Sequence, residues 1–399
     1  MMTLDVVGRR TLVLAGALML AGACTRSAQT VTVATPPSAV QSTPAAATPA
    51  PTPVASAERQ TLPDRLSDAD YWKLEQAISE PGGYFRIEDN YTSNEMEIGQ
   101  LFTQLRDEHV SGDVYMGVGP EQNFTYIAAI RPRMAFIVDI RRQAVMQHLM
   151  FKAIFELAPD RAEFISLLFG KPRPPIGAAD TSIQRIWELY RNVASDSALS
   201  AKTWARVVDR LTNVHGFTFT QDESDKLKAV YDAFYFYGPS ISTRGYSGGR
   251  GGDFAELTAY SMDQSGRPRS FLSSEENYRY IKNLHERNLI VPVSGDFAGP
   301  KAIRAIGEYV RQHDAIVRAF YVSNVEQYLF GDNHDQLFYA NVATLPIDST
   351  SVFIRPYSMR GRYNYAGGPT MTLCPIRMFL AAVDSGRVTN NEMALSCGK

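Results

Sequence analysis

The sequence has 399 residues, in which 40 lysines and arginines stand against 42 aspartates and glutamates, and 45% of the residues are hydrophobic. The apolar content excludes an intrinsically disordered chain. The balanced charge excludes a nucleic-acid binder that relies on net positive charge. We therefore expect a folded protein with no nucleic-acid partner.

The N-terminus predicts export. Arg9 and Arg10 form a short basic stretch, and an apolar run over residues 12–23 follows it and ends in small residues. This run is much shorter than the roughly 20 residues that a membrane-spanning helix needs. The pattern is typical of a signal peptide over residues 1–24, so we expect the protein to be periplasmic or on the outer surface.

Two resemblances refine this expectation. Residues 20–24, Leu-Ala-Gly-Ala-Cys, resemble a bacterial lipobox, with Ala21 where the motif usually has leucine. The resemblance implies that Cys24 carries lipid and anchors the protein to a membrane; ordinary cleavage after a small residue is the alternative. Residues 9–14 also resemble a twin-arginine export signal, so the sequence leaves the export route open between that and the general one.

Residues 25–60 form a linker before the folded part, which spans residues 61–399. The linker consists mainly of alanine, proline, threonine and serine. Such a segment cannot bury enough surface to offset the entropy of ordering it, so we expect it to be disordered. Its prolines favour extended conformations, which makes it a semi-rigid spacer.

The cysteine count predicts one disulfide. The chain has three cysteines, Cys24, Cys374 and Cys397. If Cys24 is lipidated, the remaining two form an even pair, and an exported compartment permits them to be oxidised. We therefore expect a bond between Cys374 and Cys397.

The most informative pattern lies between residues 113 and 157. It reads as strand, glycine turn, helix, strand, acid and helix, at residues 114–116, 117–120, 123–130, 134–138, 139 and 143–157. Pro120 suits the first turn of a helix. Two strands joined by a helix predict a parallel sheet with helices on both faces, so the fold class is α/β and Rossmann-like.

Other elements surround this unit. Residues 161–237 read as a large helical insertion, and a loop rich in glycine and serine follows over 238–252. Further helices are expected at 68–79, 94–109, 275–287, 299–312 and 325–330. Further strands are expected at 84–87, 289–293, 315–322, 336–347 and 351–355.

A ligand site is expected at the ends of the strands. Gly119 and Asp139 lie 20 residues apart, the layout in which a glycine lets a ligand approach the backbone and an acid accepts hydrogen bonds from ribose hydroxyls. The third glycine of a dinucleotide-binding turn is absent after Gly119, which argues against NAD or FAD and suits a ligand without phosphates. The alternative is a Rossmann-like fold whose cleft is empty or repurposed.

Here the sequence resembles the class I methyltransferases that bind S-adenosylmethionine, over residues 113–142 and 289–329. Gly117 and Gly119 match the glycine turn that faces the methionine part of the cofactor, and Asp139 matches the acid that holds the ribose. The run Gly295-Asp296-Phe297 matches the third-strand end, whose acid reaches the adenine amine. Ser323 and Asn324 match the fourth-strand end beside the reaction site, and Glu121 is counted with these cofactor-binding residues.

The chain departs from this pattern at Met116, where the family usually has an acid, and in the length of the helical insertion. It also resembles a bacterial family within or near that superfamily, through the runs 118–124 and 320–328. The resemblance implies a methyltransferase-type sheet and a small-molecule ligand.

Three other polar motifs have simpler interpretations. Residues 89–95 either line the cleft or form a turn in which Ser93 caps the next helix. Residues 332–335, Asp-Asn-His-Asp, are metal-ligand types, but four adjacent polar residues favour a solvated turn, so no metal is expected. Residues 245–249 match G-x-S-x-G, but the apolar strand that a nucleophile elbow needs before its serine is missing, which favours a loop or lid.

The predicted export conflicts with the predicted cofactor, because S-adenosylmethionine is made and kept in the cytoplasm. The domain could bind another small molecule, carry its ligand out already folded by the twin-arginine route, or never be exported. Fold does not imply function. The sequence therefore leaves open whether the protein is a methyltransferase or a non-catalytic, surface-tethered protein with a degenerate cofactor cleft.

Overall fold

The computed structural model describes residues 61–87, 89–95, 98–177, 179–243, 252–357 and 370–398, all within the compact unit Ala57–Lys399. The predicted signal peptide, the linker and the motif at 245–249 lie outside these ranges. No helix among the described residues is both long and apolar enough to cross a bilayer.

One six-stranded sheet organises the unit, in the order β3-β2-β1-β4-β5-β6. The strands are β1 Val114–Gly117, β2 Met134–Asp139, β3 Ile290–Ser294, β4 Val317–Tyr321, β5 Val352–Tyr357 and β6 Thr370–Pro375. All neighbours are parallel except β5 and β6. The chain moves outward from β1 to β3 and then returns to the other side of β1, an arrangement compatible with a Rossmann-like fold.

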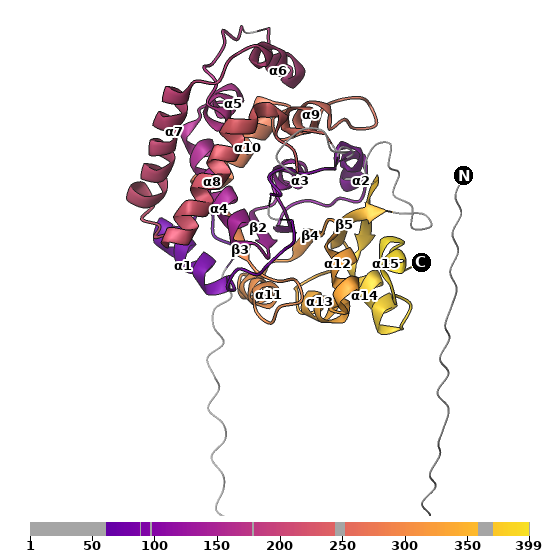
Figure 1. Cartoon of the computed structure of the whole chain (residues 1–399). Helices are drawn as coiled ribbons and strands as arrows, with labels where there is room; N and C mark the ends of the chain where they lie inside the picture. The colour runs from indigo at the N-terminus through magenta and orange to yellow at the C-terminus, as the bar shows by residue number, and fades with distance from the viewer. Residues whose placement is uncertain are drawn as a thin grey trace, which may run out of the picture. The chain divides into compact units, whose positions relative to one another are not determined.

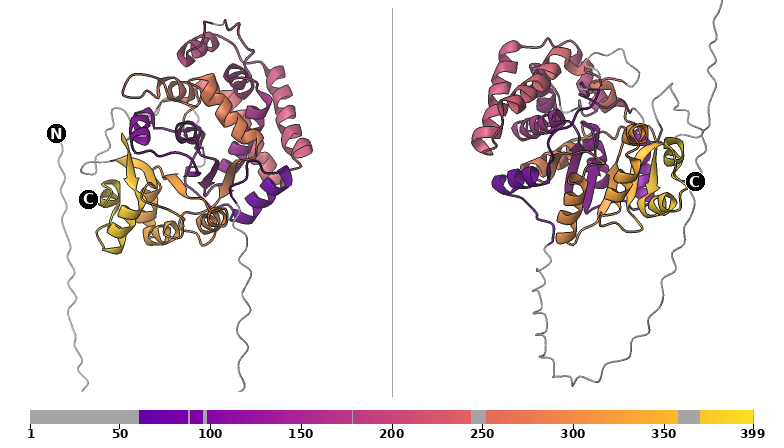
Figure 2. Two further views of the ribbon diagram at one scale, coloured as in Figure 1. Left: turned by 180° about the vertical axis from the view of Figure 1, so that it is seen from behind. Right: turned by 60° about the horizontal axis from the view of Figure 1, so that its bottom comes forward.

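Helices cover both faces of the sheet (Figures 1 and 2). One layer contains α3 Gln122–Ile130, α4 Arg142–Leu157 and α10 Glu275–Glu286, and the other contains α11 Ala302–Gln312, α13 Asp335–Val342 and α14 Ile376–Asp384. Strands β1, β2 and β3 are buried along their whole length, as continuous apolar runs in a covered parallel sheet should be.

The segment predicted as a helical insertion, residues 161–237, is largely helical. It contains α5 Arg161–Phe169, α6 Ile183–Arg191, α7 Ser197–Asp209, a π-helical turn Arg210–Val214 and α8 Gln221–Tyr237, and α9 Phe254–Tyr260 comes after it. Local sequence sets several of the starts: Asp160 caps α5, Asp196 caps α7, and Thr220 with Glu223 forms a capping box at α8. Helix α8 packs on α4, so the insertion is a second helical layer outside the first.

The remaining helices include α1 Asp68–Ile78, α2 Leu101–Asp107 after a short 3-10 turn Ile98–Gln100, α12 Val325–Asp332 and α15 Asn391–Leu395. Three sequence predictions need correction. Residues 336–347 are helical rather than extended over α13, because Phe338, Tyr339 and Val342 share a buried helical face while Leu337 is 53% exposed. Residues 84–87 form no strand, and the helix predicted from 94 starts only at Leu101.

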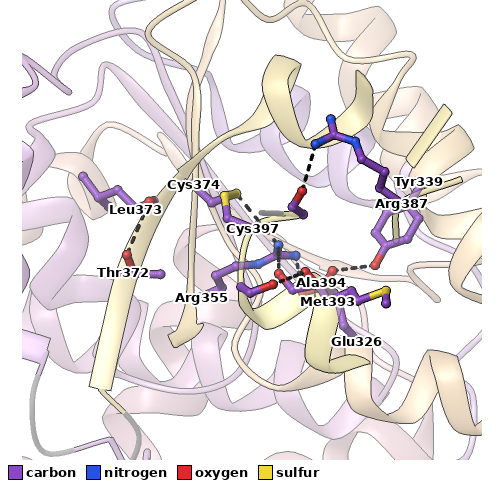
Figure 3. Close-up of a disulfide and its surroundings, with 12 residues drawn as sticks. Glu326, Tyr339, Arg355, Thr372, Leu373, Cys374, Arg387, Met393, Ala394 and Cys397 are labelled. Carbon is purple, nitrogen blue, oxygen red and sulfur yellow. Dashed lines mark hydrogen bonds and ion pairs between the residues drawn. A yellow bond between two sulfur atoms is a disulfide. The ribbon is translucent and has the colours of Figure 1, made fainter. Parts of the chain in front are cut away.

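The predicted disulfide between Cys374 and Cys397 is confirmed, with Cα atoms 5.8 Å apart. It joins β6 to the residues just after α15 (Figure 3). Beneath it, the fully buried Arg355 pairs with Glu326 and donates to the Ala394 carbonyl oxygen at 2.8 Å. The bond therefore holds the C-terminal helix over a buried ion pair.

We predict that loss of the disulfide destabilises the fold. Replacing both cysteines with serine should lower the free energy of unfolding by roughly 3 kcal/mol, because the bond closes a loop with a sequence separation of 23 residues. Urea unfolding before and after reduction measures the effect. The double serine variant is the control, since its midpoint should not respond to reductant. Equal midpoints for the oxidised and reduced wild type would contradict the prediction.

Candidate functional site

Residues 79–87 and 89–95, which we call the crossing segment, run over the carboxyl ends of four neighbouring strands. The Glu80 amide donates to the Ser294 carbonyl oxygen at the end of β3 (2.7 Å), and the Gly83 amide donates to Ile140 just after β2 (2.8 Å). Further along, the Ser93 amide donates to the Glu121 carboxylate at the start of α3, just after β1, and Glu95 accepts from Tyr321 at the end of β4. The segment thus follows the sheet order β3-β2-β1-β4.

Glu80 fixes the first part of the crossing segment. Its carboxylate accepts hydrogen bonds from the backbone amides of Asp296 (3.1 Å), Lys301 (2.7 Å) and Ala302 (2.8 Å). These amides belong to the loop after β3 and the start of α11, where unpaired N–H groups attract an anion. The protein's own carboxylate therefore occupies the anion site at this helix end.

A cleft of about 220 Å³ lies between the crossing segment and the strand ends. Six of the predicted site residues line it: Gly119, Asp139, Asp296, Phe297, Ser323 and Asn324. Asn90, Ser93 and Asn94 line the other side, so the polar cluster at 89–95 contributes to the cleft. The cleft lies where the strand order reverses, which is the ligand position in open α/β sheets.

Gly117 and Glu121 do not line the cleft. A Cβ atom on Gly117 would come within 2.0 Å of the Asn123 Oδ1 atom, so a glycine is required there by packing. The Asn123 side-chain amide donates to the carbonyl oxygens of Val118, Gly119 and Pro120. The turn is therefore held by an asparagine on the following helix, while Gly119, at φ +79°, faces the cleft.

Asp139 lines the cleft but is already paired with Arg141. Its Oδ1 atom accepts from the Arg141 backbone amide (2.9 Å) and Nε (3.0 Å), and its Oδ2 atom accepts from a terminal guanidinium nitrogen (2.8 Å). The two side chains are only 7% and 8% exposed. A ribose diol would have to share this carboxylate with an arginine.

The third-strand residues are also engaged. Asp296 accepts from the Ala298 amide at 2.9 Å, which closes its own turn. The Phe297 ring is buried and packs against Phe320 and Phe338, with ring centroids 5.3 and 5.2 Å away. Phe297 therefore belongs mainly to the core beneath the cleft.

Sequence reasoning missed Glu95, which is 2% exposed. Its carboxylate accepts from the Tyr321 hydroxyl (2.7 Å) and the Ser323 hydroxyl (2.8 Å), and Gln122 donates to the Tyr321 hydroxyl at 3.0 Å. Burial raises the pKa of Glu95, although the two hydroxyl hydrogen bonds oppose the shift. The polar cluster at 89–95 was the sequence signal for this part of the site. Only the structure shows that Glu95 is the residue of the cluster that contacts the end of β4.

Two further buried titratable groups lie under the cleft. Burial raises the pKa of Glu121 to about 8, its Oε1 atom accepts from the Ser93 amide, and its Oε2 atom has no partner among the described residues. Burial lowers the pKa of His148 to about 4, while its Nε2 atom lies 2.9 Å from the Gly119 carbonyl oxygen. Burial therefore favours the neutral form of both side chains.

A wider surface groove of about 900 Å³ adjoins the cleft and shares Tyr84, Phe85 and Arg141 with it. Tyr84 is 79% exposed. Within the described ranges, no group of three or more His, Cys, Asp and Glu side chains could hold a metal ion. Asp332 and His334, from the cluster at 332–335, line the cleft.

The chain belongs to the family described as "Domain of unknown function (DUF7790)", whose model matches residues 91–209 and 254–375. The two matched segments contain β1 to β6 and most of the cleft lining, and they leave out α8. No curated protein matches the sequence.

We predict that Glu121→Gln stabilises the protein in a pH-dependent way. The pKa of Glu121 is about 8 in the folded protein, and its ordinary value is 4.5. Between these two pH values Glu121 is ionised in the unfolded chain but protonated in the folded one, so the free energy of unfolding falls as the pH rises. Removing the acid should raise the free energy of unfolding by about 2 kcal/mol at pH 8, and the gain should disappear near pH 4. Urea unfolding at both pH values measures this.

Glu223→Gln is the control, because this change should lower the free energy of unfolding at pH 8, whereas Glu121→Gln should raise it. Although burial opposes it, hydrogen bonds from Thr220 and the Arg142 guanidinium lower the pKa of Glu223, so its contribution to stability is present above the ordinary glutamate pKa and is lost in acid. That variant should lose stability at pH 8. A Glu121→Gln variant with the same loss would contradict the burial argument.

Proposed function

We propose that the protein binds a small, nucleoside-like molecule in the cleft at the carboxyl edge of the sheet. The observation that carries the proposal is the convergence of Gly119, Asp139, Asp296 and Ser323, which are far apart in sequence, on one cleft at the reversal of strand order. S-adenosylmethionine is the first ligand to test, because the sequence resembles the methyltransferases that bind it. The adjoining Tyr84 offers an exposed aromatic face on which a planar base can stack.

The cleft fits that cofactor only in part. Its volume of about 220 Å³ is below the roughly 300–1,000 Å³ of typical small-molecule sites, so an adenosyl ligand would have to extend past Tyr84 into the groove. Asp139 is neutralised by Arg141. We therefore derive no methyl-transfer step from these residues.

The second candidate is a non-catalytic binding protein tethered to a membrane surface, with a ligand other than S-adenosylmethionine. The Asp139–Arg141 ion pair favours it, because the carboxylate that a ribose would need already accepts three hydrogen bonds from Arg141.

We also propose export, with Cys24 as a lipid anchor. The signal-like N-terminus motivates this, and the Cys374–Cys397 disulfide supports it because such bonds persist in oxidising compartments. An exported protein has no supply of S-adenosylmethionine unless it folds around the molecule before export. Export therefore favours the second candidate over a methyltransferase.

The ligand hypothesis predicts an effect of Asp139→Asn on binding. If a ribose shares the Asp139 carboxylate, this change should weaken the binding of S-adenosylmethionine and S-adenosylhomocysteine about ten- to hundred-fold, which corresponds to roughly 1.5–3 kcal/mol for a hydrogen bond to a charged group. Calorimetric titration of the folded domain measures both affinities.

Asp332→Asn is the matched control, because Asp332 lines the same cleft away from the end of β2. Its affinities should stay within about twofold of wild type. Absence of binding by the wild type to either adenosyl compound, in a preparation shown to be folded by its melting curve, would reject the adenosyl ligand and leave the second candidate.

The export hypothesis predicts the N-terminus of the mature protein. Expressed in its host, the protein should begin at Cys24 and carry lipid, and Cys24→Ser should abolish the lipid and release the protein from membranes. Intact-mass analysis with membrane fractionation tests this. A mature chain that still begins at Met1 would refute the hypothesis.

A further inference from the structure

Ser323 stands on a strained turn between a strand and a helix. Strand β4 ends at Tyr321, α12 begins at Val325, and Ser323 between them has φ +45°. Residues other than glycine rarely adopt this region, and such strain gathers at functional sites. A serine on a sharp strand-to-helix turn is also the arrangement that exposes the nucleophile of α/β-hydrolases. Ser323 lines the cleft, so its hydroxyl is within reach of a bound molecule.

The Ser323 hydroxyl donates to a buried carboxylate at 2.8 Å. That carboxylate, on Glu95, also accepts from Tyr321, and none of the described lysines, arginines or histidines forms an ion pair with it. An acid buried without a cation is costly to ionise. A glutamine at this position would also hold the crossing segment to β4, without the free-energy cost of a buried charge. A purely structural role therefore does not explain why the residue is an acid.

We propose that Ser323 is a nucleophile and Glu95 its general base, in a site that transfers or hydrolyses the acyl group of small esters or thioesters. The inference uses the same cleft as the proposed function but not the identity of the ligand bound there. It also suits an exported protein, because water is the only co-substrate that hydrolysis requires.

The reaction balances with these groups. The Ser323 Oγ atom attacks the carbonyl carbon while its proton passes to Glu95, and the bond to the leaving alcohol or thiol breaks as that group takes the proton from Glu95. Water then attacks the acyl-serine, giving one proton to Glu95, and the released Ser323 oxygen recovers it. The products are a carboxylic acid and an alcohol or thiol.

The surroundings of Ser323 fit this chemistry. The Asn324 backbone amide, next to the serine, donates to no other group in the described part of the chain, so it is a candidate to stabilise the oxyanion. Phe85, Val325 and Leu329 give the cleft an apolar side, which suits a short acyl chain. Tyr321 is a positioning residue, because it holds the second oxygen of Glu95.

The test is covalent labelling of the full mature chain with a fluorophosphonate, followed by intact-mass analysis and peptide mapping. We expect one adduct, on Ser323, and none in Ser323→Gly, a variant whose glycine suits φ +45° and so preserves the fold. Glu95→Gln should lower the labelling rate roughly 100-fold. Ser385→Ala, a serine at the end of α14, is the control and should label like wild type.

A second measurement covers the case in which Glu95→Gln fails to fold. The wild-type labelling rate should rise as the pH increases through the ionisation of Glu95, and 4-nitrophenyl acetate should give a burst of 4-nitrophenol that Ser323→Gly lacks. No adduct on Ser323 of a folded wild type, an adduct on another serine, or a pH-independent labelling rate would overturn the proposal. None of these results depends on adenosyl binding, so the two proposals fail separately.

Discussion

The cleft and the topology around it depend on one constraint, the attachment of the crossing segment to the carboxyl ends of four strands. Two carboxylates hold the two ends of the segment, and the Glu80 and Gly83 amides add contacts at the ends of β3 and β2. Glu80 takes three backbone amides around the start of α11, and Glu95 takes the hydroxyls of Tyr321 and Ser323 at the end of β4. Between them, Gln147 on α4 donates to the Tyr91 carbonyl oxygen at 2.6 Å.

The crossing segment also limits the volume of the cleft. An open α/β sheet holds its ligand at the strand ends and at the unpaired amides of a helix start, so the segment occupies part of the space that a ligand would otherwise take. The small volume of the cleft follows from this.

The sequence predicted the parts of the structure that depend on neighbouring residues. The glycine turn before α3, the acid at the end of β2 and the helical insertion all have local signals, and the elements lie where those signals indicate. The disulfide was predictable because only two cysteines follow the linker. The apolar run at 336–347 was misread, since a short apolar stretch has no period that separates a strand from a buried helix; only the burial of Phe338, Tyr339 and Val342 on one side shows the helix.

The contacts that decide the chemistry of the cleft were beyond sequence reasoning, because side-chain pairing has no local sequence signal and some of the partners lie far apart in the chain. The sequence predicts Asp139 as a free acceptor for a ribose, but in the structure the Arg141 guanidinium, two residues later, donates to its carboxylate. Glu95 reads as one polar residue in a turn, and its partners lie 226 and 228 residues away. Glu121 reads as a cleft residue beside the glycine turn, yet its side chain is buried below the cleft and contacts the crossing segment. The position of a residue after a strand predicts at which edge of the sheet its side chain lies. It does not predict whether that side chain already has a hydrogen-bond or ion-pair partner in the protein.

The pairing of its acids divides the cleft into two sides of different chemistry. On the side of β2 and β3, Asp139 is paired with an arginine and Asp296 closes its own turn, so these groups are placed to recognise and orient a molecule. On the side of β4, Glu95 has hydroxyl partners and no cation among the described residues. A carboxylate whose charge is not balanced by a cation is the stronger base in a buried site. If both proposals hold, recognition belongs to the ends of β2 and β3, and proton transfer belongs to the end of β4. This division holds for a nucleoside, for an anionic ligand and for an ester alike, because it follows from which acids are paired.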